Sequence, residues 1–355
     1  AFIGYEWTSM IEGNNLHRVV VFRDGKDRVD QVLPFSALQS DNPADLWGWL
    51  ERYQLKTGGR VLAIPHNGNL SNGRMFSMLD FNGLPLSRES SEMRSRWEPV
   101  IEVAQIKGDS ESHPFLSPND EFAGYGDAGW DTGNLSLQEL STPDMYAGEY
   151  AREALKRGLR LEQMLGTNPY QFGMIGSTDS HTGLSTADDD NYFAKNVQVE
   201  PRPGRVDYVA KQYSGITRYG WQYLAGGYAA VWATQNSRGA LFDAIQQREV
   251  YATTGPRITV RFFGGWDFIA DDALAPDLAR LGYRKGVPMG SDLPARTADN
   301  SPQFLIGALK IVECYQNVEQ KLRSPRAFFS QNKCITHWLF NQNLRGKMQY
   351  GVLIN

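Results

Sequence analysis

Arg60-Val61-Leu62-Ala63-Ile64-Pro65 is an apolar run with the length and composition of a buried β-strand. Two further runs, Pro99-Val100-Ile101-Glu102-Val103-Ala104 and Phe172-Gly173-Met174-Ile175-Gly176, have the same character. Helical patterns lie between these runs, so strand and helix alternate along the chain. Such alternation favours a parallel sheet or barrel with crossover helices. The sequence therefore predicts an α/β fold.

The expected helices have readable ends. Each follows a residue that can cap its first turn, and two of them end at glycine. The expected helical segments are 43–57 after Asn42, 143–165 after Thr142 and 238–248 after Ser237. Proline at positions 43 and 143 supports two of these starts, because proline is favoured at the first helical position.

The texture of the sequence changes near residue 255. Thr259-Val260-Arg261-Phe262-Phe263 alternates between polar and apolar residues, which predicts an antiparallel strand. Residues 295–312 have the composition of a loop, and residues 331–355 show no usable periodicity. We therefore expect two domains, one over residues 1–255 and a β-rich C-terminal extension over residues 256–355.

The composition excludes several classes of protein. The chain has 355 residues, of which 41% are hydrophobic and 21% charged, so it is neither disordered nor fibrous. Its net charge of −4 provides no basic surplus for nucleic acid. Its apolar runs are far shorter than the roughly 20 residues of a membrane-spanning helix. Two cysteines, Cys314 and Cys334, leave one disulfide or two free thiols open.

Ionisable residues follow the predicted strands. Glu6 ends an opening strand-like run, His66 follows the strand at 61–65, and Asp179 and His181 follow the strand at 172–176. Because sites in parallel α/β folds lie at the carboxyl ends of the strands, we expect these groups to converge. In an extended segment, positions i and i+2 also face the same side. Imidazole with carboxylate suits zinc, manganese or iron. The alternatives are a hydrogen-bonded turn for Asp-x-His, a turn cap for His66 and an ion pair with an arginine for Glu6.

Taken in order, these motifs resemble the PHP superfamily, the polymerase and histidinol phosphatase metallohydrolases. The likeness covers roughly residues 1–270 and is specific only as a set, and it is greatest to a bacterial branch of unknown function. The residues that carry it are Gly4-Tyr5-Glu6, His17, Pro65-His66-Asn67-Gly68, Ile101-Glu102-Val103 and Gly176-Ser177-Thr178-Asp179-Ser180-His181-Thr182-Gly183. The resemblance implies a distorted (β/α)7 barrel that holds two or three divalent ions (Zn, Mn or Fe).

The resemblance also implies roles for individual residues. The metal ligands that it implies are Glu6, His17, His66, Asp179 and His181. Glu102 would hold an ion or orient a ligand. PHP domains also carry an early His-x-His, which would lie before Ala1. The chain starts at Ala1 without Met, so we interpret this end as cut, processed or incomplete.

Cationic and amide side chains near these motifs are candidates for contact with a substrate. Lys107 follows the Glu102 strand and can hold a phosphate oxygen, although an ion pair with Glu111 in a surface loop is the alternative. Asn67 is assigned to substrate binding. Arg257 can bind an anion or pair with a carboxylate of the barrel. Glu102 and Lys107 are the expected catalytic residues.

We therefore expect a metal-dependent hydrolase, a phosphoesterase that uses a metal-activated water at the C-terminal end of the barrel. The substrate would be a small anion. One alternative is a non-catalytic binding or structural protein on an eroded PHP barrel, and another is a metallohydrolase of an amide or sulfate ester. A removed signal peptide would place the protein in the periplasm or outside the cell, with the cytoplasm as the alternative. The oligomeric state is left open.

Other motifs are given no role. Gly124-Tyr125-Gly126-Asp127-Ala128-Gly129 matches G-x-G-x-x-G, but it lacks the preceding strand and following helix of a dinucleotide site. We expect a loop there. Asp188-Asp189-Asp190 is expected to be a solvated loop. His113 and His337 have no supporting context.

Overall fold

The computed structural model describes residues 1–182, 194–213, 215–224, 226–295, 301–309 and 349–354. Two compact units make up the chain, Ala1–Gly255 and Pro256–Asn355, and the division falls where the texture of the sequence changes. Asp188-Asp189-Asp190, Cys314, Cys334 and His337 lie outside the described residues, so the predictions for them stay predictions. No described helix has the length and apolar character needed to cross a membrane.

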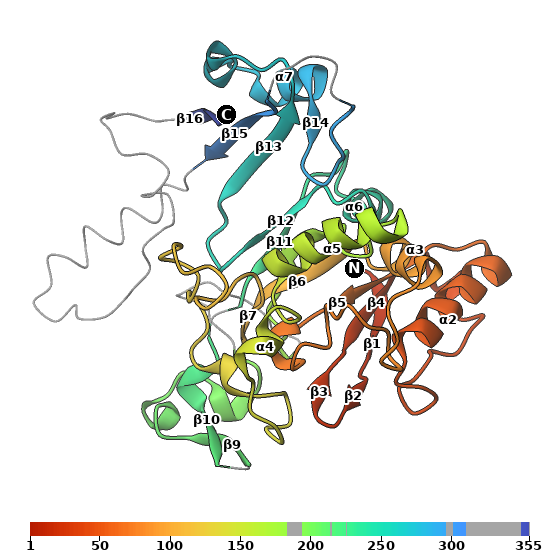
Figure 1. Ribbon diagram of the computed structural model, residues 1–355, viewed down its shortest axis with the longest axis vertical. Coiled ribbons are helices and arrows are strands. Elements are labelled where there is room, and N and C mark those ends of the chain that lie inside the picture. Colours follow the sequence, from red (N-terminus) through yellow and green to blue (C-terminus); the bar gives the residue numbers. More distant parts are fainter. Residues whose placement is uncertain (183–193, 214, 225, 296–300, 310–348, 355) are drawn as a thin grey trace, which may run out of the picture. The chain divides into compact units, whose positions relative to one another are not determined.

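The first sheet positions the candidate site. It contains β1 (Ile3–Trp7), β4 (Arg18–Phe22) and β5 (Val61–Pro65), which lie in the order β1-β4-β5 (Figure 1). Both pairings are antiparallel, and Trp7, Arg18 and Pro65 are aligned across the sheet. The end of β1, the start of β4 and the end of β5 therefore meet at one edge. The small hairpin of β2 (Met10–Ile11) and β3 (Asn14–Asn15) joins β1 to β4.

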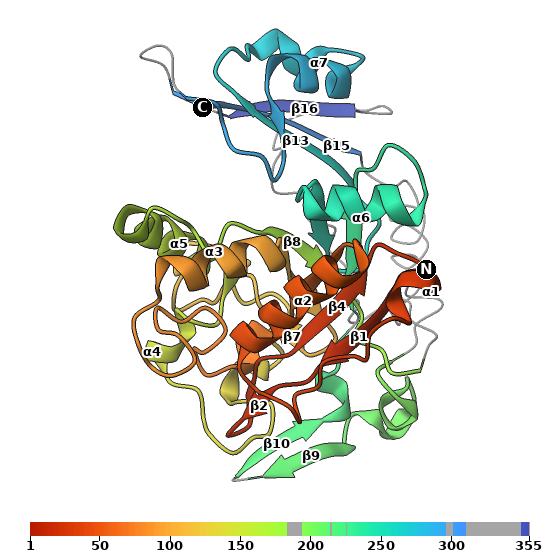
Figure 2. The same ribbon diagram turned by 90° about the vertical axis from the view of Figure 1, so that its right-hand side faces the viewer.

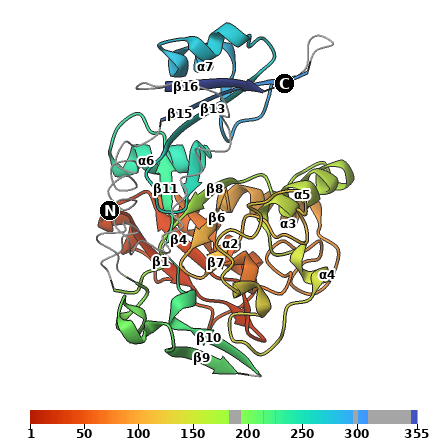
Figure 3. The same ribbon diagram turned by 90° about the vertical axis from the view of Figure 1, so that its left-hand side faces the viewer.

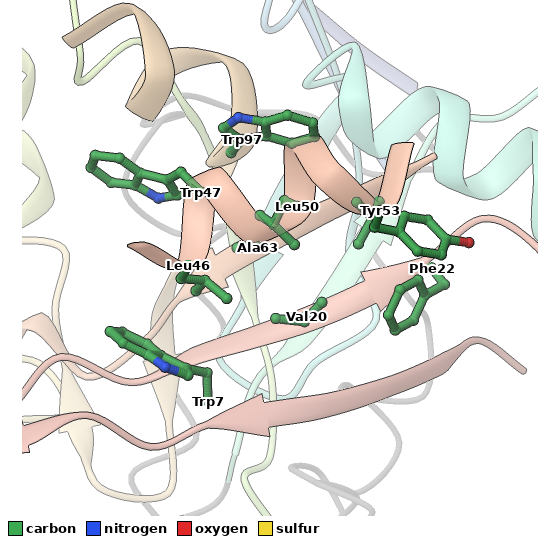
Figure 4. Packing of buried hydrophobic residues seen from close by; sticks show 10 residues of the cluster. Trp7, Val20, Phe22, Leu46, Trp47, Leu50, Tyr53, Ala63 and Trp97 are labelled. Atoms are coloured by element: carbon green, nitrogen blue, oxygen red, sulfur yellow. The ribbon is translucent and has the colours of Figure 1, made fainter. Parts of the chain in front are cut away.

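Helix α2 (Pro43–Thr57) covers one face of this sheet, and its ends confirm the sequence prediction. The Asn42 side chain accepts a hydrogen bond from the backbone N–H of Ala44, and Gly58 ends the helix in the left-handed conformation. Figure 4 shows Leu46 and Leu50 of α2 directed toward Val20 of β4. The core here is formed by Trp7, Val20, Phe22, Leu46, Trp47, Leu50, Tyr53, Val61, Ala63 and Trp97. Each large side chain buried in this way contributes about 1.5–3 kcal/mol to folding.

A second sheet lies beside the first. It contains β7 (Gly108–Asp109), β6 (Val100–Gln105) and β8 (Gly173–Gly176), and the β6–β8 pair is parallel. Strand β6 lies next to β5, and β8 lies next to β11 (Tyr228–Val231) and β12 (Val250–Thr253). Helix α5 (Ala151–Leu165) belongs to the crossover between β6 and β8 (Figure 2).

The first unit has several further elements. Helix α6 (Arg238–Gln246) begins after Ser237, whose side chain accepts from the backbone of Ala240, which confirms the predicted cap. Figure 3 shows α6 and the hairpin of β9 and β10. The remaining α-helices and strands described in this unit are α1 (Lys26–Val29), α3 (Arg88–Trp97), α4 (Pro143–Tyr146), β9 (Val209–Tyr213) and β10 (Ile216–Tyr219).

The second unit is a four-stranded antiparallel sheet with a small apolar core. Its strands lie in the order β14 (Val287–Pro288), β13 (Thr259–Gly265), β15 (Gln303–Leu309) and β16 (Gln349–Ile354). Phe263, Phe268 and Leu305 form the core, and α7 (Leu278–Lys285) packs against it. Strand β13 confirms the antiparallel strand predicted at 259–263. The loop predicted over 295–312 is wrong at residues 303–309, which form β15.

The predicted (β/α)7 barrel is wrong. The described strands form several small, mostly antiparallel sheets, and these do not close into a barrel. An apolar run indicates that a strand is buried, but not whether it pairs in parallel or antiparallel. The sequence pattern could therefore not distinguish a parallel barrel from small antiparallel sheets. The ten residues between Trp7 and Arg18 form a small hairpin, whereas a parallel crossover usually takes a dozen or more and a helix.

The single helix predicted over 143–165 is also wrong in its middle. It is divided into α4 and α5, which ends at Gly166 as expected. The break contains Gly148, where an added Cβ would lie 2.1 Å from the carbonyl oxygen of Gly73. This close approach of two backbones requires glycine at position 148.

Candidate metal centre and its lysine pair

Three of the predicted ligands lie together. Oε1 of Glu6 lies 2.9 Å from Nδ1 of His17 and 3.0 Å from Nε2 of His66. The two imidazole rings are 5.5 Å apart and nearly perpendicular, at 78°. One possible ligand atom from each residue lies within 4.8 Å of the other two. The carboxylate of Glu6 therefore joins both histidines in one group.

Antiparallel register brings these residues together. Glu6 is the last but one residue of β1, His17 immediately precedes β4, and His66 immediately follows β5. The sequence argument placed Glu6 and His66 at carboxyl ends of parallel strands, and these ends do meet. His17 instead reaches the same edge at the start of an antiparallel strand.

The group is partly shielded from water. His66 is buried and His17 nearly so, whereas about a third of the Glu6 side chain is exposed. Burial alone would raise the pKa of Glu6, but hydrogen bonds and charge interactions with the two histidines outweigh it and lower that pKa. Burial lowers the pKa of His17, although the hydrogen bond that His17 donates to Glu6 acts to raise it. His17 is therefore a neutral imidazole at neutral pH, the form that binds metal ions.

The donor set fits a divalent transition metal. Two imidazole nitrogens with one carboxylate oxygen are the ligands of many zinc and non-haem iron sites. Ligand atoms about 2.0–2.2 Å from one ion lie at most about 4.4 Å apart, and the three atoms lie within 4.8 Å of one another. Small side-chain adjustments would suffice to hold an ion. Nδ1 of His66 is buried and has no hydrogen-bond partner among the described residues, so the Glu6 carboxylate at Nε2 is the group that sets the tautomer of this ring.

The remaining two predicted ligands belong to a neighbouring group. Oδ2 of Asp179 lies 2.6 Å from Nζ of Lys107 and 2.8 Å from Nζ of Lys195. Oδ1 of Asp179 lies 3.5 Å from Nε2 of His181, which in turn lies 2.8 Å from the Lys195 ammonium. The sequence predicted that Asp-x-His lies on a tight turn or in an extended segment, and the left-handed backbone of Asp179, with φ of 52°, excludes the extended segment. A turn directs both side chains to one place.

Two ammonium groups meet one carboxylate here. Asp179, Lys107 and Lys195 are almost fully buried, whereas most of the His181 side chain is exposed. Burial alone would raise the pKa of Asp179, but Lys107, His181 and Lys195 hold it well below its usual range. Burial, together with the charge of Lys107, lowers the pKa of Lys195. With both lysines protonated, the triad of Asp179, Lys107 and Lys195 has a net positive charge.

Electrostatic interactions connect the two groups. The charge of Lys107 acts on His17, and the charge of Glu6 acts on Lys195. Glu102 accepts a hydrogen bond from the Ser177 hydroxyl, and its carboxyl group interacts with the charges of His66 and Asp179. Burial raises the pKa of Glu102. The metal-ligand group, Glu102 and the lysine pair therefore form one continuous site.

Asn67 supports this site from within. It is buried with a left-handed backbone, φ 51°, and its Oδ1 accepts a hydrogen bond of 2.7 Å from Nε2 of Gln105. Nδ2 of Asn15 donates to the carbonyl oxygen of His66 at 2.6 Å. The side chain of Asn67 is thus engaged inside the protein, where it supports the His66 loop, and its predicted contact with substrate stays a prediction.

The other substrate candidates have different outcomes. Lys107 is buried against Asp179, and Glu111 pairs with Arg152 at 2.6 Å, so the alternative of a Lys107–Glu111 surface pair is wrong. Arg257 belongs to the second unit, and its role stays a prediction. Sequence reasoning missed Lys195. No motif surrounds it, and it lies 14 residues beyond His181, so only the folded chain reveals its contact with Asp179.

A cavity of about 390 Å³ lies elsewhere in the first unit. Its lining includes Arg18, Trp47, Arg94 and Tyr170, but none of the residues of the candidate site. Arg18 and Arg94 both pair with the buried carboxylate of Glu98, at 2.9 and 3.0 Å. This cavity is therefore separate from the candidate site.

Comparison with known proteins identifies a family. The family model described as "Protein of unknown function (DUF3604)" matches residues 1–318, most of the chain. The chain therefore belongs to the DUF3604 family. No curated protein and no solved structure matches it.

Proposed function

We propose that this member of the DUF3604 family is a metal-dependent hydrolase that acts on a small anionic ester, most simply a phosphoester. The observation that carries the proposal is the carboxylate oxygen of Glu6, which lies within 3.0 Å of a nitrogen of both His17 and His66. Beside it, Lys107 and Lys195 provide more positive charge than Asp179 neutralises.

Each group has a distinct task in this proposal. Glu6, His17 and His66 would hold the ion. A bound zinc, manganese or iron ion polarises the substrate and lowers the pKa of a coordinated water. Lys107 and Lys195 would bind the anionic oxygens of the substrate and offset the charge that develops on them. Glu102 would position His66 and the Ser177 loop. Asp179 would hold the two ammonium groups together rather than bind the ion.

The choice of a phosphoester combines two arguments. The lysine pair is suited to a tetrahedral anion, since ammonium groups bind phosphate as compact point charges. The motifs in the sequence resemble those of PHP metallohydrolases, and this likeness is the source of the reaction type. A sulfate ester also carries an anionic oxygen that the two lysines could bind, whereas a neutral amide carries none. Export from the cytoplasm stays a prediction.

A non-catalytic binding protein is the second candidate. It is favoured by the engagement of Asp179 with two lysines, which leaves three rather than five of the predicted ligands in one group. Such a protein would bind an anion at Lys107 and Lys195 without turning it over.

A hydrolysis assay separates these candidates. The purified protein, supplied in turn with Zn²⁺, Mn²⁺ and Fe²⁺, would be tested on an aryl phosphate, an aryl sulfate and an anilide. We expect metal-dependent hydrolysis of the phosphate, abolished in Glu6→Gln and reduced at least tenfold in Lys195→Met. Asp45→Asn, which changes an exposed carboxylate of α2, is the control and should retain full activity. Phosphate binding without hydrolysis under any metal would favour the binding protein.

A further inference from the structure

A second cluster of ionisable side chains lies apart from the proposed centre. His113, Asp127 and Asp131 each place a possible ligand atom within 4.8 Å of the other two. Nε2 of His113 lies 3.3 Å from Oδ2 of Asp131. Asp127 falls in the glycine-rich segment 124–129, which the structure confirms as a loop. None of these residues takes part in the proposed hydrolysis.

Buried polar atoms without partners point into this cluster. The Tyr150 side chain is completely buried, and its hydroxyl has no hydrogen-bond partner among the described residues. Its ring packs against that of His113, with centroids 5.2 Å apart. Four carboxylates act on the Tyr150 hydroxyl, and these are Asp127, Glu149, Asp131 and Asp109. Oδ1 of Asp127 is also buried without a partner. An unfilled ligand position would account for both orphaned oxygens.

Burial acts strongly on two carboxylates of this region. Burial raises the pKa of Asp127 to about 6 and that of Glu149 to about 8, as expected for carboxylates without a cation. Glu149 is fully buried, and the backbone N–H groups of Asn72 and Gly73 only partly oppose the rise of its pKa. The Arg218 guanidinium donates to the carbonyl oxygens of residues 129 and 130, and the pKa of Asp131 is lowered by its hydrogen bond with His113 and by the charges of His113 and Arg218. A cation bound at Asp127 would favour the ionised form of this carboxylate, which burial disfavours.

The hydrogen bonds of His113 indicate what kind of cation fits. Its Nδ1 accepts a hydrogen bond of 3.1 Å from the backbone N–H of Phe115. The proton of the neutral ring is therefore on Nε2, which donates it to Asp131. His113 thus orients Asp131 and offers no lone pair to an ion. The donors that remain are carboxylate and hydroxyl oxygens, which suit a hard cation such as Ca²⁺ and not zinc.

We propose that Asp127 and Asp131, together with the Tyr150 hydroxyl, bind a Ca²⁺ ion at a site separate from the Glu6–His17–His66 group. Its role is structural. Trp130, next to Asp131, packs against the turn after Lys107, where an added Cβ on Gly108 would lie 2.8 Å from Cβ of Trp130. The ion would stiffen the loop that supports Lys107.

Terbium luminescence tests this proposal, because Tb³⁺ replaces Ca²⁺ and is sensitised by nearby tyrosine and tryptophan rings. The full chain, stripped with EDTA, would be titrated with Tb³⁺ and then with Ca²⁺ as competitor, and its thermal unfolding measured with and without Ca²⁺. We expect sensitised emission that Ca²⁺ displaces, and a Tm raised by Ca²⁺. The same result in Glu6→Gln would separate this ion from any ion at the proposed centre.

Two variants make the result specific. Asp127→Asn should weaken Ca²⁺ binding at least tenfold, yet unfold no earlier than the wild type in EDTA, because it removes an uncompensated buried charge. Asp144→Asn, an exposed carboxylate of α4, is the matched control and should bind Ca²⁺ like the wild type. The proposal is overturned if the stripped protein shows no response to Ca²⁺ or Tb³⁺, or if the two variants bind equally well.

Discussion

Replacing Asp179 by asparagine separates the two roles that this carboxylate can play. Asparagine has almost the same shape, so its carbonyl oxygen can still accept a hydrogen bond from Lys107 or Lys195. The substitution removes only the negative charge between two ammonium groups that lie 2.6 and 2.8 Å from Oδ2. If Asp179 anchors the lysine pair, the variant loses stability. If Asp179 is a metal ligand, it loses metal.

The size of the effect follows from the contacts. A hydrogen bond to a charged group contributes about 1.5–3 kcal/mol, and its neutral counterpart about half as much. Two such bonds are weakened, and two nearly buried ammonium groups are left facing each other. We expect a loss of about 3 kcal/mol, at the lower end of the range for breaking a buried ion pair, because the triad retains some contact with water.

Denaturant unfolding and metal analysis on the same samples provide the assay. We expect Asp179→Asn to lower the free energy of unfolding by that amount and to retain the metal content of the wild type. Asp45→Asn, in the first turn of α2, should change the free energy by less than about 1 kcal/mol. A variant that loses its metal but unfolds like the wild type would refute the reasoning and restore Asp179 as a ligand.

Three further predictions concern the fold around the site. Glu98→Gln should cost about 3–5 kcal/mol, because it leaves the buried Arg18 and Arg94 unpaired. Burial would raise the pKa of Glu98, but charge interactions, above all with Arg18, lower it. The ion pair of Glu98 therefore stabilises the fold at neutral pH, and this contribution is lost as pH falls through the lowered pKa of Glu98. The stability of Glu98→Gln, followed by urea unfolding between pH 7 and 3, should therefore fall less steeply than that of the wild type. Leu50→Ala should cost about 2–5 kcal/mol by the same assay, since Leu50 is completely buried under α2. Gly148→Ala should lower Tm by several degrees, because its Cβ would meet a backbone oxygen, and an unchanged Tm would contradict the reported close approach.

Local signals predicted the helices well. Asn42 and Gly58 bound α2, and Ser237 starts α6, because caps act through hydrogen bonds and backbone conformations within a few residues. The break at Gly148 escaped prediction because it depends on Gly73, which is distant in the sequence. Strand direction escaped prediction for the same reason, since an apolar run is equally suited to either partner orientation.

The site was predictable in its parts but not in its grouping. The sequence predicted Glu6, His17 and His66 as ligands, and the antiparallel register of β1, β4 and β5 brings these three residues together. Of the two lysines, only Lys107 was predicted from the sequence, because the contact of Lys195 with Asp179 depends on the tertiary fold. The second cluster escaped altogether. His113 lies in no motif, and the glycine-rich segment around Asp127 predicts only a loop, so only the folded chain brings the two residues together.

The metal content of the native protein tests the central claim most directly. Inductively coupled plasma mass spectrometry would be applied to the wild type and to Glu6→Gln, both purified without chelator. We predict at least one equivalent of zinc, manganese or iron per chain in the wild type, and its loss in the variant. A wild type that binds none of these metals, even after reconstitution, would contradict the account and leave the Glu6–His17–His66 group as a hydrogen-bonded cluster.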